Sequence, residues 1–376
     1  MSGPATSGPP AGDRSVIYLY PPDDRVARGG ADLRVERLAQ GVAKTWPTQL
    51  LRIGAGLDID ARPTVAARTY GMLRGIPPRL SQRFDASLRR RVASATRDAD
   101  VIVLGTTFCA PLVPPTFLGR CVLDAHNLEW RVVEQLARQA PRTRRWAYAR
   151  SVRWTRWYEA RLARHVAGVW AVSPEESAWF TRAGARRVSV IPNGVDLPPL
   201  PPWPAAPSLI FVGSLASRFN RDGLDWFLAE CWDPIRAAVP GVRLLVAGRG
   251  GQDIQGPGVE AFGFVDDLGD LYAQSSVAIV PLRHGAGTRL KVLEAMAHGR
   301  GVVATPVGAE GLQVDSGDGV VIASTGVDFV AACIRLLKSP DTARQTGSRG
   351  RRTAVERFDW RSIGMSAALT LSDVLG

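Results

Sequence analysis

The stretch from Gly285 to Ala297, GAGTRLKVLEAMA, joins a glycine-rich turn to a helix-forming run that carries charge on one face. At ~100° per residue, Lys291 and Glu294 fall on one side of the helix, and apolar residues line another side. Glycine lets a ligand approach the backbone closely, and the free N–H groups at a helix start bind phosphate well. Lys291 adds a cation, while Glu294 can accept hydrogen bonds from vicinal hydroxyls such as those of a ribose. The pattern therefore predicts a nucleotide-phosphate site.

A plainer interpretation of this stretch is an amphipathic helix with a Lys/Glu pair on its solvent-exposed face. The use of lysine in the chain bears on this choice. Lysine occurs only at Lys44, Lys291 and Lys338, and arginine supplies almost all the other positive charge. A lysine retained at position 291 against this bias slightly favours a chemical role.

His126 is a second candidate, because it directly follows a predicted strand from Cys121 to Asp124. The carboxyl ends of parallel strands are where open α/β sheets collect their ligands. Taken alone, the residue is better explained by a structural histidine whose hydrogen bonds are satisfied. The sequence pattern by itself therefore favours the structural interpretation.

The string from Val277 to Leu312 resembles the donor-nucleotide signature of the family 4 glycosyltransferases, which have the GT-B fold. Further motifs of that family occur in its order and at its spacing. They are the GG turn at Gly29 and Gly30, DAHNLE at Asp124 to Glu129, VSPEE at Val172 to Glu176, IPNGVD at Ile191 to Asp196, and FVGSL at Phe211 to Leu215. The resemblance implies an α/β protein of two Rossmann-like, doubly wound domains that face each other across a cleft.

The resemblance also implies a binding site for a nucleotide-diphosphate sugar as donor substrate, with no other cofactor and no metal. The donor-binding positions in this chain are Gly30, Val265, Gly287, Thr288, Arg289, Leu290, Lys291 and Glu294. His126 falls where similar enzymes place a histidine against the transferred sugar, so it would orient hydroxyls and would not be the nucleophile. Because family members retain the anomeric configuration, we expect a front-face displacement in which the leaving diphosphate takes the acceptor proton.

The chain departs from the family pattern at the diphosphate. Many relatives bind the diphosphate with an arginine and a lysine. This chain has Ser214 at the position of the arginine and Asn220 at the position of the lysine. We expect Arg289 and Lys291 to replace these two cations, because a diphosphate still carries its charge. In a second departure, Ala286 stands where the family has a glutamate that contacts the donor sugar, so the resemblance does not extend to the identity of that sugar.

Metal chemistry has little support in the sequence. Asp58 and Asp60 spell the DxD pattern of other glycosyltransferases, but they precede what reads as a loop. Asp266 and Asp267 open a predicted helix, where acidic residues interact favourably with the dipole. The cysteines stand far apart without a CxxC pair, which argues against a zinc site or a disulfide scaffold and favours the reducing cytoplasm. They are Cys109, Cys121, Cys231 and Cys333.

Length and composition indicate a two-domain protein. The chain has 376 residues, of which 45% are hydrophobic and 22% charged, as is usual for a soluble globular protein. No apolar run approaches the ~20 residues that span a bilayer. We expect a disordered tail at 1–13, an acceptor-binding domain at 14–197, a proline-rich linker at 198–207, a donor-binding domain at 208–358, and a terminal helix at 359–376 that crosses back to the first domain.

Predicted strands alternate with helices along both halves, as in parallel sheets. In the first half they are Val16 to Tyr20, Gln49 to Ile53, Val101 to Thr106, Cys121 to Asp124, Val169 to Val172 and Val188 to Ile191. In the second half they are Leu209 to Gly213, Arg243 to Ala247, Val259 to Phe262, Val277 to Pro281 and Gly301 to Thr305, with helices that begin at Leu224, Asp266, Thr288 and Val327.

Much of the net charge of +12 lies in one arginine-rich segment, Arg142 to Arg164, which also contains Trp146, Trp154 and Trp157. Such a segment can stack on nucleic-acid bases, lie on an anionic membrane surface, or form the solvated outer face of a packed helix. Its place in the acceptor-binding domain favours a membrane surface or an anionic acceptor, and we expect no nucleic acid. The expected location is cytoplasmic, and peripheral at the inner face of the membrane if the segment docks there.

Three functions fit these features. The first is a retaining, metal-independent glycosyltransferase that acts on a hydroxyl of a surface polysaccharide, a glycolipid or a natural product. The second is a nucleotide-sugar epimerase of the same fold, and the third is a non-enzymatic basic protein that binds a membrane or a nucleic acid. The phosphate-binding helix with Lys291 and Glu294 favours an enzyme, because a binding module needs neither residue.

Overall fold

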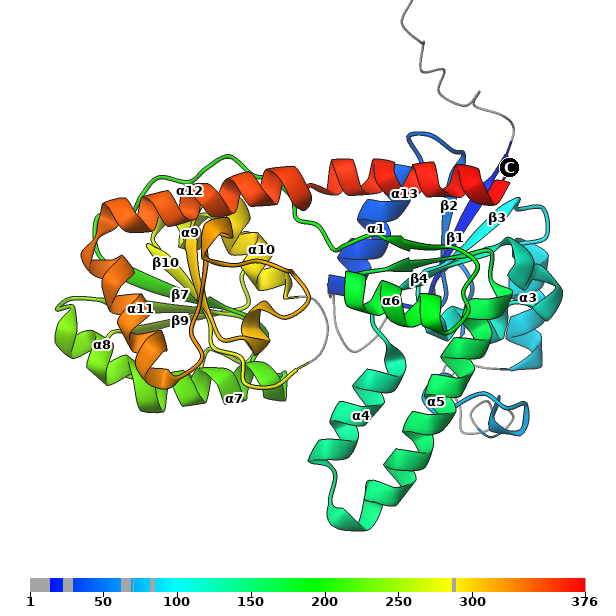
Figure 1. Cartoon of the computed structure of the whole chain (residues 1–376), viewed down its shortest axis with the longest axis horizontal. Helices are drawn as coiled ribbons and strands as arrows, with labels where there is room; N and C mark the ends of the chain where they lie inside the picture. The colour runs from blue at the N-terminus through cyan, green and yellow to red at the C-terminus, as the bar shows by residue number, and fades with distance from the viewer. Residues whose placement is uncertain are drawn as a thin grey trace, which may run out of the picture. The chain divides into compact units, whose positions relative to one another are not determined.

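The computed structural model describes residues 14–22, 30–61, 69, 71–81, 85–285 and 289–375. The chain divides into two compact units, Met1–Pro192 with Trp360–Gly376, and Asn193–Asp359. Each unit is an α/β structure built around one parallel sheet (Figure 1). The expected tail at 1–13 lies outside the described residues.

The first unit contains a six-stranded sheet in the order β2-β1-β3-β4-β5-β6. Its strands are β1 (Val16–Tyr20), β2 (Thr48–Arg52), β3 (Val101–Leu104), β4 (Cys121–Ala125), β5 (Gly168–Ala171) and β6 (Val188–Val190). All neighbouring strands in this sheet run parallel. The six strands predicted for the first half are confirmed to within two residues at either end.

Helices cover both faces of this sheet, which is why its inner strands β1, β3, β4 and β5 are buried along their whole length, whereas the edge strands β2 and β6 are partly polar and partly exposed. On one face β1 contributes Tyr18 to a core cluster that also contains Trp170 and Trp360, and on the other it contributes Leu19 to a second cluster. The helices are α1 (Gly30–Val42), α3 (Ala86–Ala95), α4 (Glu129–Gln139), α5 (Arg145–His165), α6 (Pro174–Arg182) and α13 (Trp360–Leu375).

Two of these helices, α1 and α13, cross at a pair of glycines. A Cβ atom built on Gly41 would lie 2.5 Å from Cα of Gly364, so the two backbones touch. The terminal helix therefore packs on the first unit by direct backbone contact, and Trp46 reinforces it by donating its indole N–H to the carbonyl of Ala368 at 3.0 Å.

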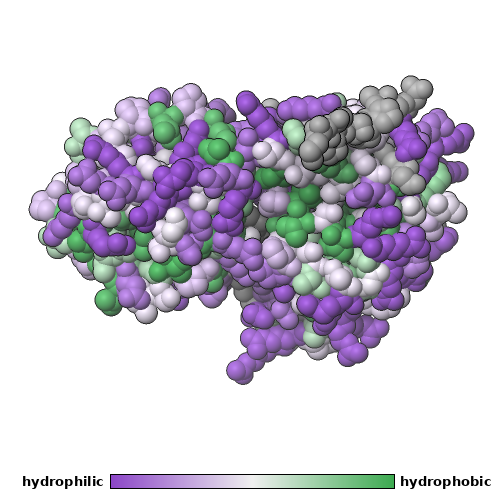
Figure 2. All heavy atoms as spheres, turned by 45° about the horizontal axis from the view of Figure 1, so that its top comes forward, coloured by the Kyte–Doolittle hydropathy of each residue, from purple (hydrophilic) through white to green (hydrophobic). Residues whose placement is uncertain are grey.

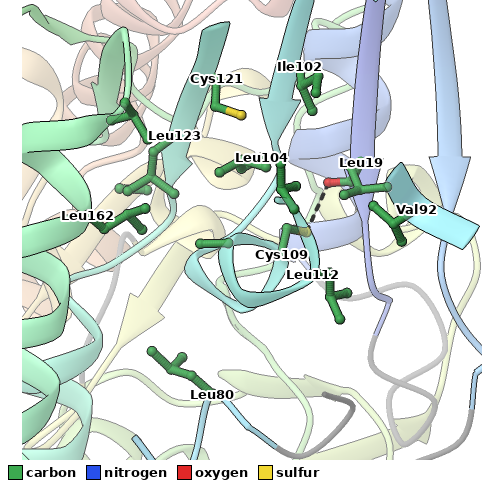
Figure 3. Packing of buried hydrophobic residues seen from close by; sticks show 14 of the residues in the cluster. Leu19, Leu80, Val92, Ile102, Leu104, Cys109, Leu112, Cys121, Leu123 and Leu162 are labelled. Carbon is green, nitrogen blue, oxygen red and sulfur yellow. Dashed lines mark hydrogen bonds between the residues drawn. The ribbon is translucent and has the colours of Figure 1, made fainter. Parts of the chain in front are cut away.

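The second cluster surrounds a buried thiol (Figure 3). Cys109 packs among leucines from several strands, and its Sγ donates to the carbonyl of Leu19 at 3.1 Å. All four cysteines are buried free thiols. Burial raises the pKa of the Cys121 thiol to about 12, so this thiol is protonated and unreactive at neutral pH.

The second unit contains a six-stranded sheet in the order β12-β11-β10-β7-β8-β9. Its strands are β7 (Ser208–Val212), β8 (Arg243–Ala247), β9 (Val259–Gly263), β10 (Val277–Val280), β11 (Gly301–Ala304) and β12 (Val320–Ile322). Numbered within the unit, this is the 3-2-1-4-5-6 order of dinucleotide-binding folds, read from the other edge. The five predicted strands are confirmed, and the three-residue edge strand β12 was not predicted.

The helices of the second unit are α7 (Arg218–Phe227), α8 (Asp233–Ala238), α9 (Gly269–Ala273), α10 (Leu290–Ala297), α11 (Gly326–Lys338) and α12 (Pro340–Arg357). Two predicted starts were wrong. Helix α7 begins six residues before Leu224, because its first turns are polar and give no apolar signal. Helix α9 begins three residues after Asp266, because Asp267 accepts a hydrogen bond from the N–H of Gly269 at 2.8 Å and forms a turn there.

The proline-rich stretch at 198–207 belongs to the second unit, because the division falls earlier, between Pro192 and Asn193. Arg300 donates to the carbonyls of Pro201 and Pro202, and its guanidinium lies 4.9 Å from the ring centroid of Trp203. The stretch expected to link the units is thus packed along one of them.

Candidate functional site

Helix α10 starts at the point in the second sheet where the strand order reverses. Strands β7 and β10 are neighbours, but the chain leaves β7 toward β8 and leaves β10 toward β11, on the other side. Loops that diverge in this way open a crevice at the carboxyl ends of the strands, where open α/β sheets bind ligands. The sheet therefore positions the start of α10 for ligand binding.

Lys291 lies in the first turn of α10 and reaches back over the end of β7. Its Nζ donates to Oδ1 of Asn220 at 2.7 Å and lies 4.9 Å from the ring centroid of Phe211. Asn220 in turn donates to the carbonyl of Ser214 at 2.8 Å. A Cβ atom on Gly213 would stand 2.7 Å from the ammonium, so a side chain there would displace Lys291 from its present position. Lys291 and Asn220 are thus adjacent in space.

The surroundings of Lys291 destabilise the charge of its ammonium group. Burial, reinforced by the nearby Arg289, lowers its pKa to about 7, although Glu294 partly opposes this shift. No ion pair joins Lys291 to a carboxylate within the described part of the chain. A half-buried cation whose hydrogen bond goes to a neutral amide gains stability when an anion binds beside it.

Glu294 lies one turn further along α10 and is also half-buried. Burial raises the pKa of its carboxyl to about 7, and Lys291 partly offsets the shift. Within the described residues its carboxylate has no hydrogen-bond or ion-pair partner. It can therefore accept hydrogen bonds from a ligand, as two ribose hydroxyls would provide.

Arg289 is the N-cap residue of α10 and is only 7% exposed. Its Nε donates to the carbonyl of Val307 at 2.9 Å, and its Nη2 lies 3.4 Å from a carboxylate oxygen of Glu310. These contacts brace the loop that follows β11. Arg289 thus contributes positive potential beside Lys291, while its own side chain is engaged with Val307 and Glu310.

The remaining predicted donor positions lie at several elements. Leu290 begins α10, Val265 follows β9 and packs on the core, and Gly30 begins α1 in the other unit. Gly287 and Thr288 lie outside the described residues. The structure thus brings Leu290, Lys291 and Glu294 together on one helix.

His126 follows the last residue of β4 and is held by a buried carboxylate. Its Nε2 lies 3.2 Å from Oδ2 of Asp124. Arg34 donates to Oδ1 of the same carboxylate from Nη2 at 2.6 Å and from Nε at 2.9 Å, and the hydroxyl of Tyr18 donates to Oδ2. Burial opposes the charge of Asp124, but Arg34 and His126 outweigh it and hold the pKa of that carboxyl well below its usual range. Asp124 therefore fixes the orientation of His126.

Sequence reasoning missed Arg34 and Tyr18. Arg34 is 1% exposed and also donates to the carbonyls of Ile191 and Pro192, beyond the end of β6. One signal could have revealed it, since Arg34 lies one turn before Leu38 on the apolar face of its helix. A charge on that face requires a buried partner.

Glu159 of α5 fixes the chain just after His126. The side chain is fully buried, and its two oxygens accept from the backbone N–H groups of Glu129 and Trp130 at 3.0 and 2.9 Å. Burial and the neighbouring Glu129 raise its pKa to about 8, against the effect of the two N–H donors. The first turn of α4, three residues after His126, is therefore tied to α5.

The two aspartates of the DxD pattern, Asp58 and Asp60, accept hydrogen bonds from nearby backbone N–H groups. Asp58 accepts from the N–H of Arg52 at 2.8 Å, and Asp60 accepts from the N–H of Gly56 at 3.1 Å. Among the described residues, no group of three or more His, Cys, Asp or Glu side chains could hold a metal ion. No helix in the described part of the chain is long and apolar enough to cross a bilayer.

Comparisons with protein families match most of the chain. The family described as "Glycosyltransferase Family 4" matches residues 28–198, and "Glycosyl transferases group 1" matches residues 206–339. An MMP alpha-(1->4)-mannosyltransferase of Mycolicibacterium hassiacum is 38% identical over 101 residues, which are 26% of this chain and 24% of that protein. An uncharacterised protein of the cps region of Klebsiella pneumoniae is 26% identical over 169 residues, 42% of this chain and 44% of that protein. The chain thus aligns with less than half the length of these curated relatives.

Solved glycosyltransferases share the fold over nearly the whole chain. Sucrose-phosphate synthase from Thermosynechococcus elongatus superposes with a TM-score of 0.70 and 19% identity, covering 96% of this chain and 99% of that one. Anabaena HepE in complex with UDP-glucose gives a TM-score of 0.63 at 19% identity, with 96% and 99% covered. At this level of identity the two likenesses establish the fold.

Proposed function

This chain belongs to the family 4 glycosyltransferases and has the GT-B fold, and we propose that it moves a sugar from a nucleotide-diphosphate sugar to an acceptor hydroxyl with retention of configuration. The acceptor would be a surface polysaccharide, a glycolipid or a natural product. A solved relative holds UDP-glucose and another relative is a mannosyltransferase, which supports a nucleotide sugar as the donor.

The observation that carries this proposal is the half-buried Lys291 at the switch point of the second sheet, which has no carboxylate ion-pair partner among the residues that the structure describes. Its ammonium touches Asn220, the position at which many family members have a lysine. We propose that Lys291 supplies the missing cation from a different element and grips the diphosphate together with the N–H groups at the start of α10. Glu294, one turn on, would accept hydrogen bonds from the ribose.

The proposed reaction is a front-face displacement. The bond between the anomeric carbon and the leaving phosphate oxygen breaks, the bond to the acceptor oxygen forms on the same face, and the acceptor proton passes to the leaving diphosphate. Lys291 and the helix N–H groups stabilise the charge that grows on the diphosphate. His126, oriented by Asp124, would hydrogen-bond to the hydroxyls of the transferred sugar.

Thermal stabilisation by a panel of nucleotide sugars tests the proposal. A ligand at 100 times its dissociation constant stabilises the native state by ~2.7 kcal/mol, which shifts a melting transition measurably. We expect one nucleoside diphosphate, and the nucleotide sugar that contains it, to raise the melting temperature much more than the matching nucleoside does. Incubation of that nucleotide sugar without acceptor then separates transfer from epimerisation, because an epimerase converts the sugar without releasing the nucleotide. Stabilisation by none of the panel would contradict the proposal.

Transfer is expected to continue in excess chelator, because Lys291 and the helix N–H groups would take the place of a metal ion at the diphosphate. The measurement is release of nucleoside diphosphate with and without EDTA, using metal-free buffers. Complete loss of activity that manganese or magnesium restores would contradict this, and variants Asp58→Asn and Asp60→Asn would then test the DxD pattern.

A further inference from the structure

Helix α5 exposes one continuous stripe of arginine and tryptophan. Trp146, Arg150, Arg153, Trp157 and Arg161 are all exposed, and their spacing of three and four residues places them on one side of the helix. Trp146 is 72% exposed and Trp157 is 51% exposed, which is unusual for the largest side chain. The stripe extends for ~22 Å along the helix axis.

The stripe also lacks the acidic partners that other helices of this protein have. Helices α4, α7, α8 and α12 each pair an arginine with an acidic residue three or four positions away. The only acid in α5 is Glu159, which is buried and caps α4. Within the described residues no arginine of α5 takes part in an ion pair, so the surface of this helix is uniformly positive.

An apolar turn lies against the middle of α5. Residues 71–73 are helical, and the turn at 71–76 that ends this helix is closed by the N–H of Ile76 donating to the carbonyl of Gly71 at 3.0 Å. The indole of Trp154 donates to the carbonyl of Gly75 at 3.0 Å and fixes the turn beside the helix. Leu73 of this turn is 81% exposed and Met72 is 37% exposed. Trp154 is therefore a structural anchor and is only partly exposed, unlike Trp146 and Trp157.

We propose that the stripe of α5 and the turn at 71–76 together dock the protein on an anionic lipid bilayer. Arginines attract the protein to anionic head groups, tryptophans settle at the interface, and Leu73 inserts among the acyl chains. Helices α4 and α5 form a hairpin that projects from the sheet of the first unit, so the stripe is accessible (Figure 1). The projecting surface is predominantly hydrophilic, as expected for peripheral contact without insertion of a whole helix (Figure 2).

Two other partners fit the surface less well. Nucleic acid would use the arginines and the two tryptophans, but an exposed leucine and methionine offer no flat ring for a base to stack on. A merely solvated helix face would carry both charges, as helices α4, α7, α8 and α12 do. Because Glu159 joins α5 to the turn after His126, a docked hairpin would also connect the membrane to the proposed sugar site, and this last step alone rests on the proposed function.

Co-sedimentation with vesicles tests the proposal on the full chain. We expect the protein to sediment with vesicles of mixed phosphatidylglycerol and phosphatidylcholine at 0.1 M salt. With vesicles of pure phosphatidylcholine, we expect the protein to remain in the supernatant. The triple variant Arg150→Gln/Arg153→Gln/Arg161→Gln should lower the partition coefficient about 100-fold, at about a factor of five per arginine. The variant Leu73→Ser should lower it about tenfold at unchanged charge.

Matched control variants lie in the second unit. Arg335, Arg349 and Arg352 are exposed on α11 and α12, and their replacement by glutamine changes the net charge equally. Val327 is 80% exposed, so Val327→Ser matches Leu73→Ser. We expect both controls to bind vesicles as the parent does. Equal losses in the control and test variants would overturn the proposal, as would binding to a single-stranded oligonucleotide that is stronger than binding to vesicles at equal phosphate concentration. Nucleotide-induced thermal stabilisation, measured on the same variants, should stay unchanged and keeps this test separate from that of the proposed function.

Discussion

Replacing Arg34 with methionine is expected to lower the free energy of unfolding of the first unit by ~3–5 kcal/mol, because it leaves the carboxylate of Asp124 buried without its main partner. Arg34 makes two hydrogen bonds to that carboxylate and also holds the carbonyls of Ile191 and Pro192. Hydrogen exchange followed by mass spectrometry localises the effect. The substitution should accelerate amide exchange in β1 and β4 and leave the exchange rates in the strands of the second unit unchanged.

The cause can be separated from loss of packing by a second substitution and by pH. In Arg34→Met/Asp124→Leu no buried charge remains, so most of the lost stability should return. In Arg34→Met alone, Asp124 is expected to become protonated in the folded state. The unfolded state releases that proton above a pH of ~4, so the deficit should grow by up to ~1.4 kcal/mol per pH unit as the pH rises. A deficit that is constant from pH 5 to pH 8, with no recovery in the double variant, would contradict the buried-charge explanation.

The features that could be predicted from the sequence are those that depend on residues close to one another along the chain. Lys291 and Glu294 share a face of α10 because they are three residues apart on a helix, and the 3.6-residue period is a local property. The predicted strands were confirmed for the same reason, since continuous apolar runs bounded by turns indicate buried parallel strands. Local patterns failed at β12, which has three residues, and at the polar first turns of α7.

The features that sequence could not predict are pairings between distant residues. Arg34 meets Asp124 across 90 positions, and Lys291 meets Asn220 across 71 positions. Residue type and motif indicated that Lys291 replaces a missing cation, but only the pairing of β7 with β10, which α7 and α10 follow along the chain, brings its ammonium to Asn220. The tryptophans of α5 show the same limit. Trp154 and Trp157 are three residues apart, and the position of Gly75 decides which of them is an anchor and which is exposed.

Replacing Lys291 with methionine is expected to weaken the binding of a nucleotide-diphosphate sugar 10- to 100-fold and to leave nucleoside binding nearly unchanged. A charge-assisted contact to the diphosphate is worth roughly 1.5–3 kcal/mol, and methionine removes the charge that lies over Phe211 while keeping an unbranched side chain of similar length. Lys338, exposed on α11, provides the matched control, so Lys338→Met should bind as the parent does. Isothermal titration with the nucleoside, the nucleoside diphosphate and the nucleotide sugar measures all three affinities.

The pH dependence of the same binding tests whether the charge of Lys291 is responsible. Because the pKa of the unliganded ammonium is lowered to about 7, the charged form that the diphosphate requires becomes scarce above pH 7. Parent affinity should therefore fall by up to ~1.4 kcal/mol per pH unit between pH 7 and pH 9, whereas Lys291→Met, already weak, lacks this component. The pKa of Glu294 is raised to about 7 and is coupled to Lys291, so the affinity ratio of the two proteins is measured in a Glu294→Gln background, where this component is absent from both. We expect that ratio to be largest near pH 6 and to shrink steadily at higher pH, and a ratio that stays constant from pH 6 to pH 9 would exclude the ammonium as the group that grips the diphosphate.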